Sequence, residues 1–171
     1  KYKGNIFMYD SQRDSLMVAL KLLGYSMNTQ NVEELEEAKN LLIEQRPLVY
    51  AYVTDQVIDN MIAGNAALAV VYSGDATYIM DENEDMEYVI PKEGSNMWVD
   101  AMVIPSTAQN VDLAHEFINF MQRPDIAQMN TEYVMYSTPN TEVLANVSED
   151  EWTQNEAYSP SQELLDSLPM E

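Results

Sequence analysis

Apolar residues along this chain follow two alternating patterns: short runs that predict strands, and longer stretches whose spacing predicts helices. The expected strands cover residues 4–9, 48–53, 67–72, 86–90 and 97–104. The expected helices begin near residues 11, 31, 54, 73, 110, 124, 141 and 161. Strands that alternate with helices predict an α/β fold in which a mixed sheet is flanked by helices.

The loops after three expected strands combine polar and aromatic residues. Residues 9–11, 54–55 and 72–75 each lie where a strand ends and a helix begins. In open α/β sheets, ligands bind outside the carboxyl ends of the strands. The sequence therefore predicts a ligand site along this edge of the sheet.

The charge balance excludes several classes of partner. Eight basic residues stand against 29 acidic ones, which gives a formal net charge of −21. A phosphate backbone would be repelled, so we expect no nucleic-acid binding, and anionic membrane surfaces are disfavoured as well. Cationic partners are favoured, although the same acidity could serve solubility alone. No apolar run approaches the roughly 18 residues that a membrane span needs.

Residue types that many enzymes and metal sites require are absent or isolated. The chain has no cysteine, which excludes disulfides, thiolate zinc sites and a cysteine nucleophile. The single histidine, His115, lies in an amphipathic segment and is expected on a helix surface. The acidic run 81–87 lacks the glycine and the distal glutamate of an EF-hand loop, so we interpret it as a solvated loop. We expect no cofactor and no catalysis; a hydrolase using Asp10 and Asp14 is the weaker alternative.

The most informative short segment is Trp98-Val99-Asp100. In an extended strand, residues i and i+2 point to the same face, so the indole and the carboxylate are expected side by side. An aromatic face attracts a cation, and a carboxylate neutralises it and accepts its N–H groups. The segment therefore predicts a site for an organic cation.

Further candidates lie near the strand ends and in one loop. Tyr72 ends an apolar run before a glycine-containing turn, and Tyr136 lies in the turn-rich segment 136–140. Ser11 and Asp14 have the spacing of a helix capping box, so Asp14 serves either a ligand or its own helix. Tyr72 and Trp98 have an alternative role as ordinary core residues.

Four segments resemble the polyamine-binding proteins of bacterial ABC importers. They are WVDAMVIP at 98–105, AHEFINFMQRPD at 114–125, ALKLLGYS at 19–26 and YSTPN at 136–140. The segments follow the order and spacing of the spermidine/putrescine branch of that family. The preferred polyamine stays open.

The resemblance implies a type II periplasmic-binding-protein fold, in which two lobes close on a ligand. It implies that residues 1–171 form a single α/β lobe, the second, with the first lobe and the C-terminal end absent. The expected protein is a monomeric extracytoplasmic binding component, periplasmic or a cell-surface lipoprotein, that works with ABC transporter permease subunits. One lobe alone should bind polyamine weakly. Alternatives are a lobe for another small ligand, such as an oligosaccharide or metal chelate, and a structural or adhesive surface domain.

The resemblance also implies a set of ligand-binding residues. They are Ser11, Asp14, Tyr72, Trp98, Asp100 and Tyr136. Trp98 and Asp100 match the family's tryptophan and ammonium-binding aspartate, and Tyr72 stands where relatives often have tryptophan. Asp14 stands where an acidic residue contacts the central or distal amine. Ser11 replaces an acid of well-known members, which removes one charged contact.

Overall fold

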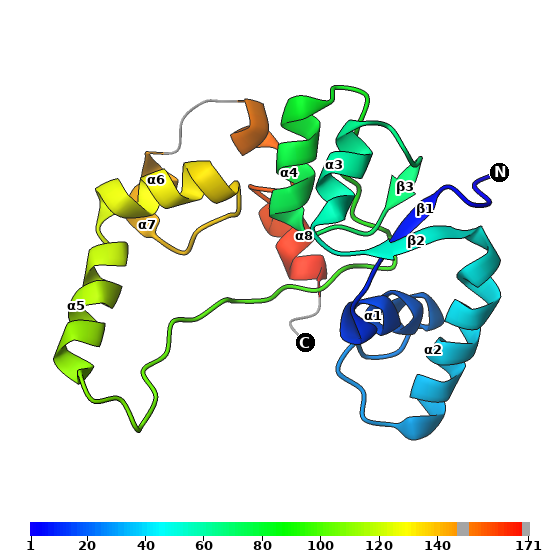
Figure 1. Cartoon of the computed structure of the whole chain (residues 1–171), viewed down its shortest axis with the longest axis horizontal. Helices are drawn as coiled ribbons and strands as arrows, with labels where there is room; N and C mark the ends of the chain where they lie inside the picture. The colour runs from blue at the N-terminus through cyan, green and yellow to red at the C-terminus, as the bar shows by residue number, and fades with distance from the viewer. Residues whose placement is uncertain (147–150, 169–171) are drawn as a thin grey trace.

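A computed structural model describes residues 1–146 and 151–168, and its sheet consists of three short parallel strands (Figure 1). The strands are β1 (Ile6–Tyr9), β2 (Val49–Val53) and β3 (Leu68–Ala69), in the order β2-β1-β3. Phe7 pairs with Ala51 on one side and with Ala69 on the other. The α/β fold class is confirmed, whereas the expected mixed sheet is wrong for the described residues, because both strand pairings are parallel and all carboxyl ends lie at one edge.

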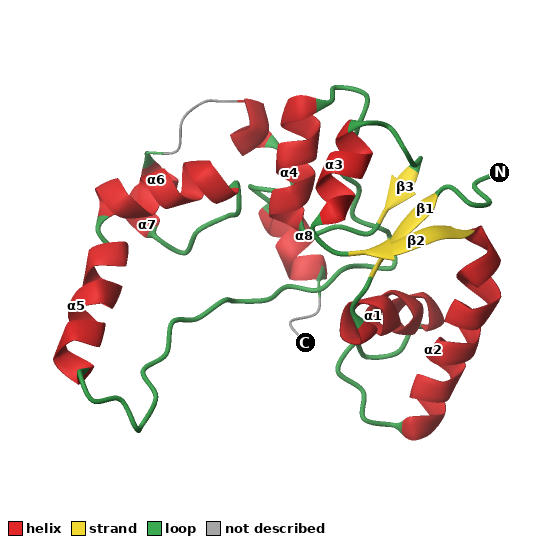
Figure 2. Cartoon of the chain, viewed as in Figure 1, coloured by secondary structure: helices red, strands yellow, loops and turns green. Residues whose placement is uncertain are grey.

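Most of the described chain outside the sheet is helical. Within the described residues the helices are α1 (Gln12–Leu23), α2 (Val32–Gln45), α3 (Gln56–Ile62), α4 (Ser73–Glu82), α5 (Val111–Met121), α6 (Pro124–Val134), α7 (Thr141–Ala145) and α8 (Gln162–Ser167), with short 3-10 helices η1 (Arg46–Leu48) and η2 (Glu151–Gln154). Figure 2 shows α1 and α2 on one side of the sheet and α3 and α4 on the other. No helix among these residues is long and apolar enough to cross a membrane.

The core consists of two clusters, one between the sheet and α3 and α4, and one between α1 and α2. One cluster joins Phe7 to Val57, Met61 and Ile79 of α3 and α4. A second cluster, built on Leu20 and Ala38 with their neighbours, holds α1 against α2. Burial of these apolar surfaces fixes the helices to the sheet and so sets the position of the loops at the strand ends.

The ends of α1 follow the predicted capping pattern. The Ser11 hydroxyl accepts a hydrogen bond from the backbone N–H of Asp14. Gly24 ends the helix in the left-handed conformation, with φ of 80°. The N-terminal cap of α1 therefore lies directly beyond β1 and includes Ser11 and Asp14.

The strands expected at 86–90 and 97–104 do not form, and that prediction is wrong. The chain between α4 and α5 is irregular, as Figure 2 shows, and Val99 and Val103 are 82% and 79% exposed. A strand requires a neighbour for its backbone N–H and C=O groups. Within the described residues, this segment pairs with no strand of the sheet, although β2 and β3 are its edge strands.

Helix α5 stands apart from the sheet, at the end of the extended segment that leaves α4 (Figure 1). It is amphipathic, yet none of its residues is buried. Leu113 and Phe117 are 61% and 57% exposed. His115 is exposed on this helix, as the sequence predicted.

Candidate functional site

Four aromatic rings from separate segments meet beyond the carboxyl end of β1. Tyr9 ends that strand, Tyr72 precedes α4, Trp98 lies in the extended segment and Tyr136 follows α6. The ring centroids of Tyr9 and Tyr72 are 4.5 Å apart, those of Tyr72 and Trp98 5.4 Å, and those of Trp98 and Tyr136 6.2 Å. We call these four rings the aromatic row.

The first carboxylate beside the row is that of Asp14. The Tyr72 hydroxyl donates a hydrogen bond of 2.8 Å to Asp14 Oδ2. Ser11 caps α1 through the backbone N–H of Asp14, while the Asp14 carboxylate binds the Tyr72 hydroxyl of the row. Partial burial, followed by the hydrogen bond to Asp14, raises the pKa of Tyr72 to about 12.

The second carboxylate, Asp75 in the first turn of α4, joins two rings of the row. The hydroxyls of Tyr9 and Tyr136 each donate to it, at 3.1 Å to Oδ2 and Oδ1. The Tyr9 hydroxyl also accepts the backbone N–H of Tyr72 at 3.1 Å. Burial, with the charge of Asp75 as a further cause, holds the pKa values of Tyr9 and Tyr136 well above their ordinary range.

Asp100 and Trp98 lie at the open side of the row. The indole of Trp98 is 41% exposed, and its ring neighbours are tyrosines. Asp100 is exposed, and its charge contributes to the raised pKa of Tyr72. The two residues come from irregular chain, so the same-face argument drawn from a strand does not explain their proximity.

The structure thus brings Asp14, Tyr72, Trp98 and Tyr136 into one connected group. Ser11 takes part through the α1 cap and Asp100 through its charge. The sequence interpretation missed Tyr9 and Asp75 as individual site residues. Both residues lie in segments that the sequence analysis placed at strand ends, Tyr9 in 9–11 and Asp75 in 72–75, and this position could have identified them.

The chemistry of this group suits the binding of a cation. Asp14 and Asp75 are hydrogen-bonded to tyrosines of the row, the charge of Asp100 acts on Tyr72, and the indole of Trp98 is exposed; no histidine takes part. Within residues 1–146 and 151–168, no cluster of three His, Cys, Asp or Glu side chains is arranged to hold a metal ion. The group lies at the carboxyl ends of the strands, which is where open α/β sheets bind their ligands.

Comparison with known proteins gives the family. Residues 1–160 match the model of the family described as "Bacterial extracellular solute-binding protein", and the chain belongs to this family. It is 36% identical over 140 residues to the "Spermidine/putrescine-binding periplasmic protein" of Escherichia coli strain K12, covering 82% of this chain and 40% of the relative.

Solved structures share the fold of this chain. A putative spermidine/putrescine ABC transporter protein from Listeria monocytogenes superposes with a TM-score of 0.91 and 44% identity. The substrate-binding protein PotD of a spermidine/putrescine ABC transporter from Streptococcus pneumoniae superposes with a TM-score of 0.81 and 40% identity. Each match covers 99% of this chain and 52% of the solved chain. The chain therefore spans about half the length of the proteins that it matches.

Proposed function

We propose that this chain forms part of the ligand site of an extracytoplasmic polyamine-binding protein that serves an ABC importer. The observation that carries the proposal is the aromatic row with a carboxylate hydrogen-bonded to it at Asp14 and another at Asp75. Relatives named for spermidine and putrescine binding support it.

The two kinds of side chain act on different parts of a polyamine. Ring faces cover the methylene chain and attract its charge, worth roughly 0.5–2 kcal/mol for each cation–π contact. Carboxylates accept ammonium N–H groups, worth about 1.5–3 kcal/mol for each hydrogen bond to a charged group. An ionised carboxylate has about four acceptor positions. Asp14 and Asp75 therefore keep acceptor capacity while their tyrosine partners hold them in place.

Asp100 and Ser11 complete the proposed set. Asp100 is exposed beside the row and is available to a second ammonium group. Ser11 brings no charge, and its hydroxyl serves the cap of α1. The site accordingly offers fewer charged contacts to a triamine than the family pattern has, and the choice between spermidine and putrescine is left to measurement.

The complete protein supplies the remainder of the site. We propose a two-lobed, monomeric and non-catalytic protein that delivers its ligand to permease subunits. The solved relatives are about twice as long as this chain, and superpose with it across α5. We therefore propose that residues of the full-length protein outside this chain pack against the exposed apolar face of α5. That residues 1–171 form one lobe remains a prediction.

Titration calorimetry of the full-length protein tests the proposal. We expect putrescine or spermidine to bind, and Trp98→Ala and Asp100→Asn to abolish binding because each removes a contact of the cation. Asp85→Asn, which removes an exposed carboxylate outside the row, is the matched control. Binding of a neutral sugar or of magnesium in place of polyamine would favour the alternative of another small ligand.

A further inference from the structure

Gly74 makes the closest approach between helix α4 and the aromatic row. It is buried in the first turn of α4, and a methyl group added there would stand closer than 3.0 Å to Cγ, Cδ2 and Cε2 of Tyr136. Cγ is the ring atom attached to Cβ, and Cδ2 and Cε2 form one edge of the ring. The whole ring of Tyr136 would therefore have to move to admit any side chain at position 74.

The backbone at this position does not itself require glycine. The other four glycines of the chain have positive φ values between 68° and 95°, whereas Gly74 has helical geometry that every residue adopts. Glycine is also among the least favourable residues in a helix. The close approach of Tyr136 is the structural reason for a glycine at this point.

The contact fixes Tyr136 in relation to its other partners. With the ring resting on Gly74, the hydroxyl reaches Asp75 Oδ1 at 3.1 Å. The same position brings the ring to Trp98 at 6.2 Å, with an interplanar angle of 77°. An edge-to-face arrangement of this kind is a favourable aromatic contact.

We propose that Gly74 is a positioning residue of the ligand site: its lack of a side chain sets the ring of Tyr136 against α4, within reach of Asp75 and Trp98. A side chain at position 74 displaces the ring, breaks the hydrogen bond to Asp75 and changes the gap between Tyr136 and Trp98. The effect on ligand affinity rests on the proposed function, whereas the effect on Tyr136 itself does not.

A double-mutant cycle in the full-length protein tests the proposal, using wild type, Gly74→Ala, Tyr136→Ala and the double variant. We expect Gly74→Ala to weaken polyamine binding roughly tenfold, the size of one well-placed cation–π contact. In the Tyr136→Ala background, the same change should alter affinity by about twofold or less, because no ring remains to be displaced. Ser73→Ala, in the same helical turn, is the matched control for helix propensity.

A second measurement follows Tyr136 without a ligand. Gly74→Ala should allow one additional tyrosine to ionise near its ordinary pKa in an ultraviolet titration, and Tyr136→Phe should remove that signal. If Gly74→Ala fails to fold, the double variant should restore folding. Unchanged affinity and tyrosine titration in Gly74→Ala, or additive losses in the cycle, would overturn the proposal. A wild type that binds no polyamine would contradict the proposed function alone, since the titration is independent of it.

Discussion

Tyrosine hydroxyls hold two of the three carboxylates at the site. Asp14 has one such partner, Tyr72, and Asp75 has two, Tyr9 and Tyr136. Each hydroxyl donates, so these hydrogen bonds persist only while the phenols are protonated. This dependence ties the geometry of the site to the protonation of its tyrosines.

Stability should therefore fall at alkaline pH. Tyr72 has a pKa raised from 10.0 to about 12 in the folded protein. Its contribution is complete below pH 10, where both folded and unfolded states are protonated, and is lost as the pH rises to about 12. Urea unfolding across this range measures the effect, and Tyr72→Phe should flatten the decline. An equal decline in wild type and variant would contradict the assignment to Tyr72.

The substitution Ser11→Asp adds a negative charge beside the site and keeps a capping residue at the start of α1. Asp caps a helix about as well as Ser, so Ser11→Asp should change the unfolding free energy by about 0.5 kcal/mol or less. The added carboxylate lies next to the site, and we expect spermidine affinity to rise roughly threefold to tenfold relative to putrescine. Calorimetry with both ligands checks this. Ser106→Asp adds the same charge in an exposed loop and should leave the ratio unchanged.

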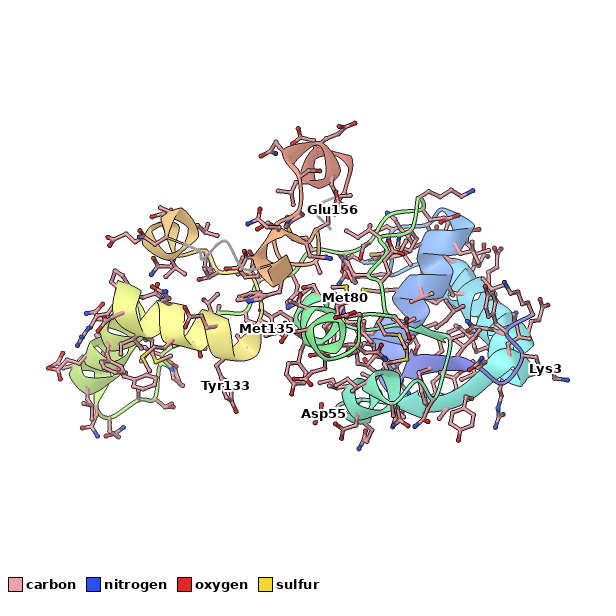
Figure 3. All side chains as sticks on the ribbon, turned by 90° about the horizontal axis from the view of Figure 1, so that it is seen from above. Lys3, Asp55, Met80, Tyr133, Met135 and Glu156 are labelled. Carbon is pink, nitrogen blue, oxygen red and sulfur yellow. The ribbon has the colours of Figure 1, made fainter. Side chains whose placement is uncertain are left out.

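At the scale of elements, the end of α6 places Tyr136. Met135 adopts the left-handed conformation, with φ of 56°, and its N–H donates to the carbonyl of Thr131. Figure 3 shows Met135 at the end of α6 next to α4. The left-handed conformation of Met135 turns the chain so that Tyr136 lies against Gly74. A methionine in this conformation is strained because its Cβ approaches the following carbonyl.

Comparing Met135→Gly with Met135→Ala isolates that strain, since both changes remove the side chain. In a right-handed helix, Ala would be the more stable by about 1 kcal/mol. In the left-handed conformation we expect the opposite order, with Gly more stable by about 1 kcal/mol. Denaturant unfolding of the two variants gives the difference directly. A more stable Ala variant would show that position 135 is not held in this conformation.

Elements also differ in how far the sequence predicts them. The first helix was predicted with both of its caps, because Ser11, Asp14 and Gly24 act through contacts within one or two turns. The segment 97–104 has the composition of a strand, but a strand forms only when the chain brings it beside a partner, and in the described residues this segment pairs with no strand of the sheet. Local contacts were therefore predictable, and pairing over long distances was not.

At the scale of the whole molecule, α5 and the extended segment leave apolar surface uncovered. Phe117 and Val103 are 57% and 79% exposed, although the helix is strongly amphipathic. A helix with this pattern normally buries its apolar face against another element. The proteins of about twice this length that superpose on the chain contain the additional residues that such a cover needs.

The variant Phe117→Ala in the full-length protein tests whether the apolar face of α5 is buried there. If the other half of the polypeptide buries the ring, the unfolding free energy should fall by about 2 kcal/mol or more. Tyr133→Ala is the control, because its ring on α6 is 88% exposed and points away from the chain in Figure 3. A loss at Phe117 no larger than at Tyr133 would show that α5 stays uncovered.

The sequence by itself determined the α/β class, the caps of α1 and most of the residues that gather beyond β1, and it predicted a site for a cation. These follow from composition, local spacing and the resemblance of four segments to one family. Tertiary structure decided how those residues meet: Asp75 between Tyr9 and Tyr136, and the ring of Tyr136 on Gly74. The contacting residues lie more than 60 positions apart in sequence. Contacts of that separation depend on how the core packs the elements, which local patterns of residues do not encode.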